Sequence, residues 1–178
     1  EDMFILGSID QGITIVKKVN NLVQKTNLTT DSTWHLTKNT KGFLVSSDSE
    51  KINLFDENLN LIKSFSTHTQ GYKYAVLSDD GLYFGTNAGL FLQKDDSSRL
   101  ISKNIISSLS INENSLTIAA GTPDGKVLII KNGEITNSID TKKNEPIFDV
   151  ELTSDNLIYI AGQDGLKKYE NGLLENLN

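Results

Sequence analysis

The sequence predicts an all-β protein in which a unit of short antiparallel strands recurs along the chain. Three observations support this: apolar and polar residues alternate, small residues recur at a nearly fixed interval, and Gly-containing turns separate the apolar runs. No apolar pattern at helical spacing is long enough to predict a helix of ordinary length. We therefore expect 19 short strands and take their repeated parts in order.

An apolar run that ends in a small residue marks one strand of each unit. The small residues lie at positions 7, 46, 85, 121 and 162, which gives spacings of 39, 39, 36 and 41. Four of these residues are glycine and one is serine. A bulkier side chain there would crowd a neighbouring sheet, so the pattern predicts close packing of one sheet on the next.

A polar turn and a second apolar run follow each small residue. Asp124-Gly125 and Asp164-Gly165 are typical of tight hairpin turns, because glycine adopts positive φ without strain. Another turn, such as Asn132-Gly133 or Asn171-Gly172, then leads to a third and shorter run. These runs predict the two outer strands of each unit.

In four of the five units, a further strand precedes the strand with the small residue. Its apolar positions alternate, as Trp34 and Leu36 do, and a period of two predicts a strand. The first unit lacks this inner strand. The complete units are expected over residues 33–66, 72–103, 106–139 and 147–177.

Four antiparallel strands repeated about every 39 residues predict a β-propeller of about five blades, which we treat as one domain over residues 1–178. One such sheet cannot bury both of its faces, whereas blades packed side by side cover each other. A two-layer sandwich gives no reason for so regular a repeat. Two interpretations stay open: a nearly complete five-bladed ring, or part of a larger ring whose other blades come from elsewhere, including a partner protein.

Two kinds of propeller repeat resemble this sequence. Residues 81–90 and 157–166 resemble the blade signature of two-component-regulator propellers, and residues 118–130 are more similar to repeats of the WD-repeat-like superfamily. The resemblance covers nearly the whole chain and implies the propeller fold without one particular function. The chain also departs from these families, because no Trp-Asp ends a strand and no Gly-His opens a repeat.

Composition argues against several classes of function. The chain has 23 acidic and 17 basic residues, whereas a nucleic-acid groove needs an excess of Lys and Arg. No apolar run approaches the roughly 20 residues of a membrane-spanning helix. Cysteine is absent, which excludes disulfides and thiolate ligands. We expect a protein of the cytoplasm or nucleus, and an extracellular or periplasmic location stays open.

No group of residues predicts catalysis or metal binding. Residues 121–127 approach the phosphate-loop pattern, but the spacer is one residue short and the segment lies between two strands, so a hairpin turn is the better interpretation. The two histidines, His35 and His68, show no paired spacing of the kind that zinc sites use. We therefore predict no enzymatic activity and no cofactor.

The loops that join successive units carry the candidate partner-binding residues. Large side chains with an apolar body and a polar tip are frequent interface anchors, and Trp34, on the same rim, is assigned to the core between blades. The candidates are His35, His68, Tyr72, Tyr74, Lys142 and Lys143.

These observations favour a non-catalytic platform for protein–protein interaction. One alternative is a ligand-sensing propeller domain of a signalling receptor, which the motifs around Gly85 and Gly162 suggest. The other is a hydrolase or lyase whose reacting residues lie on the loops.

Overall fold

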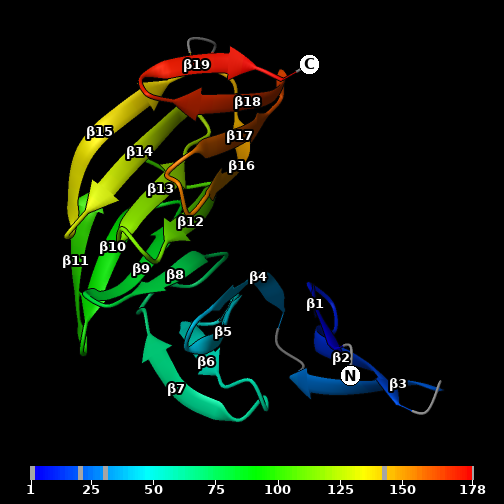
Figure 1. Cartoon of the computed structure of the whole chain (residues 1–178). Helices are drawn as coiled ribbons and strands as arrows, with labels where there is room; N and C mark the ends of the chain where they lie inside the picture. Colours follow the sequence, from blue (N-terminus) through cyan, green and yellow to red (C-terminus); the bar gives the residue numbers. More distant parts are fainter. Residues whose placement is uncertain (1–2, 20–21, 30–31, 142–143, 178) are drawn as a thin grey trace. The chain divides into compact units, whose positions relative to one another are not determined.

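The computed structural model describes residues 3–19, 22–29, 32–141 and 144–177, and their regular secondary structure is entirely β. Nineteen strands form five antiparallel sheets, and within each sheet the strands lie in chain order (Figure 1). Because each strand pairs with its sequence neighbour, short hairpins make every connection inside a sheet.

The first sheet has three strands and the other four sheets have four strands each. The first comprises β1 (Met3–Ser8), β2 (Gly12–Val19) and β3 (Leu22–Thr29). The second comprises β4 (Thr33–Asn39), β5 (Gly42–Ser47), β6 (Lys51–Phe55) and β7 (Leu61–Ser66). The third comprises β8 (Tyr74–Ser78), β9 (Gly81–Thr86), β10 (Gly89–Lys94) and β11 (Ser97–Ser102).

The fourth sheet comprises β12 (Ser108–Asn112), β13 (Thr117–Gly121), β14 (Lys126–Lys131) and β15 (Glu134–Asp140). The fifth comprises β16 (Ile147–Leu152), β17 (Ile158–Gly162), β18 (Gly165–Glu170) and β19 (Leu173–Asn176). The predicted all-β fold and its 19 strands are thereby confirmed, and the first sheet has three strands among the described residues.

The chain forms two compact units, residues 1–75 and 76–178, with the boundary inside β8. In the first unit, Ile13 of β2 packs against Val45 and Phe55 of the second sheet. In the second unit, the fourth and fifth sheets share a core to which each contributes aliphatic side chains, among them Ile129 and Ile160. Neighbouring sheets therefore cover each other's apolar faces within each unit.

The small residues permit this close approach. A Cβ on Gly85 would lie 2.3 Å from Ile106 Cγ2, and one on Gly121 would lie 2.8 Å from Ile147 Cγ2. In the first unit, a Cβ on Gly7 would lie 2.8 Å from Thr33 Cγ2. The expected crowding is thus confirmed at these three glycines.

Gly162 does not follow the same rule. The nearest atom to a Cβ added there is the Pro146 carbonyl oxygen at 3.3 Å, so no side chain of a neighbouring sheet would be displaced. The other three glycines meet residues at or just before the start of the next sheet in the chain, whereas Gly162 belongs to the fifth sheet, the last sheet among the described residues. The expectation of sheet-to-sheet crowding is therefore wrong at this position.

Within the part of the chain that the structure describes, no helix is long and apolar enough to cross a membrane.

Candidate partner-binding site

Four aromatic side chains from two segments of the chain meet within residues 1–75. Trp34 and His35 belong to β4, Tyr72 precedes β8, and Tyr74 is the first residue of β8. The ring centroids are 5.9 Å apart for Trp34 and Tyr72, 6.4 Å for Tyr72 and Tyr74, and 5.3 Å for His35 and Tyr74. The tilted and edge-to-face angles are those that attractive aromatic pairs adopt. We call these four residues the aromatic cluster.

A β-bulge turns Trp34 toward the surface. Thr33 pairs with Ser47 and His35 with Ser46, so Trp34 has no pairing partner on β5. Trp34 is 42% exposed and Tyr72 is 37% exposed. The assignment of Trp34 to the core is therefore wrong, because the bulge interrupts the alternation on which that assignment depended.

The same bulge recurs at the start of β16. Ile147 pairs with Gly162 and Asp149 with Ala161, which leaves Phe148 without a pairing partner and 60% exposed. No ring contact joins Phe148 to another residue of the described ranges. Phe148 thus reproduces the bulged and exposed aromatic residue of β4 without the surrounding cluster.

His35 connects the aromatic cluster to the backbone behind it. The Ala75 N–H donates a hydrogen bond to His35 Nδ1 at 3.2 Å, and the Thr37 hydroxyl donates to the Ala75 carbonyl at 3.3 Å. Burial lowers the pKa of His35 to about 4, which keeps the imidazole neutral and Nδ1 available as an acceptor at neutral pH.

Lys73 supports the segment that carries the two tyrosines. Its side chain is fully buried, and Nζ donates to the carbonyls of Ser49 at 2.6 Å, Gly71 at 2.8 Å and Ser47 at 3.4 Å. Burial lowers the pKa of Lys73, and the carboxylates of Asp48 and Glu50 act in the opposite direction. The loop before Tyr72 is therefore tied to the β5–β6 turn.

Sequence reasoning missed this lysine, and the only signal was its position between Tyr72 and Tyr74. In an extended segment, that position places the Lys73 side chain opposite the two rings.

The remaining predicted residues do not join the cluster. His68 is exposed, has a positive φ of 53°, and makes no ring contact with the aromatic cluster among the described residues. Lys142 and Lys143 lie outside the described residues. Of the six predicted partner-binding residues, the structure brings together His35, Tyr72 and Tyr74, and it adds Trp34 to them.

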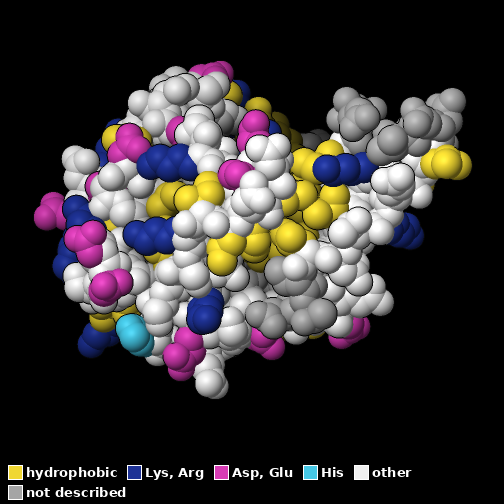
Figure 2. All heavy atoms as spheres, turned by 90° about the horizontal axis from the view of Figure 1, so that it is seen from below, with side chains coloured by type: hydrophobic (Ala, Val, Ile, Leu, Met, Phe, Trp, Pro, Cys, Tyr) yellow, Lys and Arg dark blue, Asp and Glu magenta, His cyan; other side chains and the backbone are white. Residues whose placement is uncertain are grey.

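One face of the molecule mixes charged and hydrophobic side chains. On the face drawn in Figure 2, Lys and Arg side chains are interspersed with Asp and Glu, and hydrophobic side chains emerge between them. Within the described ranges, no group of three or more His, Asp or Glu residues is placed to hold a metal ion. The aromatic cluster provides ring faces, ring edges and phenol groups on a fastened backbone, which suits binding.

The fold of the chain is similar to that of a solved structure. The crystal structure of Sqt1 from Chaetomium thermophilum, a WD40 propeller protein, matches 98% of this chain with a TM-score of 0.73 at 15% sequence identity. This likeness shows the fold, a β-propeller. The chain spans 57% of the length of that Sqt1 chain. No family model and no curated relative matches the sequence, so the resemblance to two-component-regulator propellers stays a prediction.

Proposed function

We propose that this chain is a non-catalytic platform for protein–protein interaction and that the aromatic cluster is its contact site for a protein partner. The observation that carries the proposal is the exposed pair of Trp34 and Tyr72, whose ring centroids are 5.9 Å apart. Trp and Tyr dominate interface hot spots because they bury a large area with few rotatable bonds.

The base of the cluster supports the same proposal. Lys73 fixes the loop before Tyr72 through three carbonyls, and His35 fixes Ala75 through its backbone N–H. Since the rings are already held in place, a partner that contacts them loses little conformational entropy at the interface. Such a preformed site favours binding over a role in packing alone.

The test compares two bulged aromatic residues of the same chain. A photo-reactive benzoyl-phenylalanine is placed at Trp34, at Tyr72 and, as the matched control, at Phe148, and the chain is irradiated in its native cells. We expect one discrete protein adduct from Trp34 and Tyr72 and none from Phe148. Once that partner is purified, Trp34→Ala should weaken its binding by about tenfold or more, and Phe148→Ala should leave it within about twofold.

Thermal unfolding of both alanine variants provides the control for folding. Equal adducts from all three positions, or unchanged binding by a folded Trp34→Ala variant, would contradict the proposal.

A second expectation concerns the first sheet. Among the described residues β1 pairs only with β2, whereas an inner strand lies beside the corresponding strand in the other four sheets. Phe4 and Leu6 of β1 are 63% and 53% exposed. We propose that the partner supplies further blades of the ring beside the first sheet, in which case amide hydrogen exchange of β1 slows in the complex. Unchanged amide exchange in β1 would contradict this second proposal and leave the proposal for the aromatic cluster intact.

We also propose the expected location, in the cytoplasm or nucleus.

A further inference from the structure

Two gaps between the outer strands of neighbouring sheets in residues 76–178 have the same construction. Arg99 of β11 pairs with Leu92, and Asn137 of β15 pairs with Ile129 at the corresponding place in the next sheet. Each of these outer-strand residues lies near the final hairpin turn of the sheet that follows. Those turns are Asn132-Gly133 and Asn171-Gly172, and they share one conformation, with φ of 52° and 76° in the first and 50° and 85° in the second.

The gap between the third and fourth sheets is filled by Arg99. Its Nη2 donates a hydrogen bond to the Gly133 carbonyl at 2.9 Å. A Cβ added to Gly133 would lie 2.5 Å from that Nη2 and 2.8 Å from Leu92 Cδ2, so the guanidinium packs closely on the turn. Arg99 is the only arginine of the chain. Arg99 therefore shows how a guanidinium binds in a gap of this kind.

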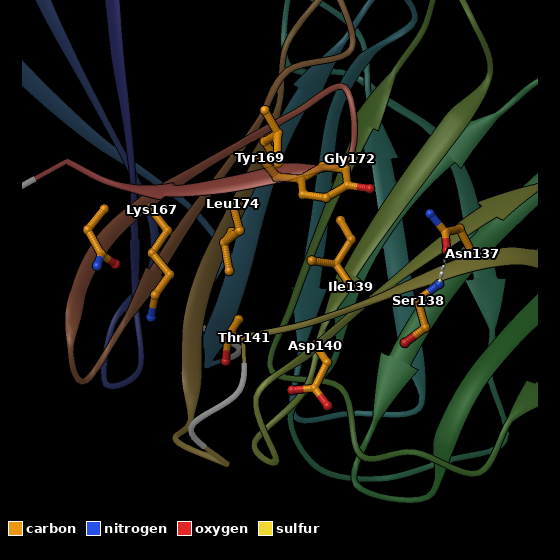
Figure 3. A pocket seen from close by; sticks show the side chains of 11 residues that line it. Asn137, Ser138, Ile139, Asp140, Thr141, Lys167, Tyr169, Gly172 and Leu174 are labelled. Atoms are coloured by element: carbon orange, nitrogen blue, oxygen red, sulfur yellow. Dashed lines mark hydrogen bonds between the residues drawn. The ribbon is translucent and has the colours of Figure 1, made fainter.

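The gap between the fourth and fifth sheets is open. A cavity of about 700 Å³ lies there, lined by β15, β18 and β19 and by the Gly172 turn. A Cβ added to Gly172 would meet no atom within 4 Å. Asn137 does not bridge the gap, because its Oδ1 accepts a hydrogen bond from the neighbouring Ser138 N–H at 2.8 Å. Figure 3 shows this bond at one side of the cavity and Tyr169 beside Gly172.

We propose that this cavity binds the arginine side chain of a partner polypeptide, with the guanidinium on the Gly172 carbonyl as Arg99 is on the Gly133 carbonyl. Tyr169, Leu174 and Ile139 line the cavity and suit the methylene groups of an arginine. The planar guanidinium also matches carbonyl acceptors, and the Asp140 carboxylate lies in the same lining.

The lining favours a side chain over free arginine. Among the described residues that line the cavity, Lys167 is the one basic residue, and its ammonium is paired with the Asp164 carboxylate. These described lining residues therefore offer no unpaired cation to hold the α-carboxylate of a free amino acid. The proposal concerns a surface remote in sequence from the aromatic cluster and does not depend on the function proposed for that cluster.

The test is a ¹⁵N-HSQC titration of the full chain with Nα-acetyl-arginine amide. We expect saturable shifts of the Gly172 and Leu173 amides in the millimolar range, because a single guanidinium makes few contacts. Nα-acetyl-citrulline amide has nearly the same shape without the charge and should bind at least about tenfold more weakly. Free arginine should bind no more tightly than the blocked amide.

Two variants test whether Arg99 is the correct template. Asn137→Arg should place a guanidinium on Gly172 and abolish the response of that turn to the probe. Arg99→Ala should empty the first gap and create a new probe-dependent shift at Gly133, which the unaltered chain lacks. Together these two results support the proposal.

Three outcomes overturn it: no saturable shift at Gly172, equal binding of the citrulline analogue, or an unchanged Gly172 response in a folded Asn137→Arg variant. Tighter binding of free arginine would overturn the assignment to a partner polypeptide. If Asn137→Arg does not fold, the new shift at Gly133 in Arg99→Ala decides, and its absence counts against the proposal.

Discussion

His35 is both a member of the aromatic cluster and the hydrogen-bond acceptor for the Ala75 backbone. Its burial lowers the pKa to about 4 from the ordinary value of 6.5. Between these two pH values the unfolded chain binds a proton at this histidine and the folded chain does not. Stability is therefore expected to fall as the pH decreases from about 6.5 to about 4.

We predict that this histidine accounts for up to about 3 kcal/mol of lost unfolding free energy across that pH window. Urea unfolding at a series of pH values measures the loss. His35→Asn retains an acceptor near the Nδ1 position and does not titrate, so its pH profile should be flatter by that amount. A variant profile parallel to that of the unaltered chain would show that His35 is not the titrating group.

Lys73 gives the second prediction at this scale. Lys73→Met removes the ammonium but keeps the apolar stem, which leaves the buried Ser47 carbonyl and the carbonyls of Ser49 and Gly71 without this donor. We expect a loss of about 2–4 kcal/mol in urea unfolding, whereas the exposed control Lys51→Met should change stability by less than about 0.5 kcal/mol. Similar small losses in both variants would mean that the loop before Tyr72 is held by other contacts.

The sequence could predict part of the candidate site and not the rest. His35, Tyr72 and Tyr74 are large amphipathic residues next to strand starts, and that feature was sufficient to select them. The assignment of Trp34 to the core was wrong because a bulge adds one residue to a strand and changes the side of the sheet on which the next side chains lie. No local residue pattern predicted this bulge. Lys73 escaped because a buried charge depends on carbonyls from a distant turn.

At the scale of elements, Asn112 joins two neighbouring sheets. Its Nδ2 lies 2.8 Å from the Thr153 carbonyl and 3.0 Å from the Ser154 carbonyl, while its Oδ1 accepts from the Asn114 N–H at 3.0 Å. The end of β12 is thereby fastened to the turn between β16 and β17. One side chain satisfies polar groups of two sheets at a buried position.

Asn112→Asp tests this connection with almost no change in volume. A carboxylate would lose the hydrogen bonds that Asn112 donates to the carbonyls of Thr153 and Ser154 and to Asn156 Oδ1. It would also face those two carbonyls, so we expect unfolding free energy to fall by about 2–4 kcal/mol at neutral pH. Asn114→Asp, at an exposed neighbouring position, should cost less than about 0.5 kcal/mol. If both variants unfold at the same urea concentration, Asn112 does not join the sheets as described.

The strands could be predicted from the sequence because the residues that favour each hairpin turn lie next to the strands that it joins. The second four-strand repeat, expected over residues 33–66, is the span from β4 to β7 in the structure. Asn132-Gly133 and Asn171-Gly172 both adopt the positive φ values that their composition predicted. Local patterns could not predict which side chains fill the gaps between sheets. Arg99 and Asn137 lie at corresponding positions of β11 and β15, but Arg99 fills its gap and Asn137 leaves its gap open.

At the scale of the whole molecule, the propeller fold depends on sheets that pack face to face at the repeated small residues. Gly85 and Gly162 occupy corresponding places in the sequence repeat, and neither has a positive φ. A Cβ would lie 2.3 Å from Ile106 at Gly85 and 3.3 Å from the nearest atom at Gly162. The first substitution forces Ile106 to move, whereas the second requires the Pro146 carbonyl to shift by only a few tenths of an ångström.

The most direct measurement is therefore the unfolding free energy of Gly85→Ala and Gly162→Ala in urea. We predict that Gly85→Ala loses at least about 2 kcal/mol of unfolding free energy and that Gly162→Ala changes it by less than about 1 kcal/mol. Equal values for the two variants, or a larger loss at Gly162, would contradict the packing of successive sheets as propeller blades.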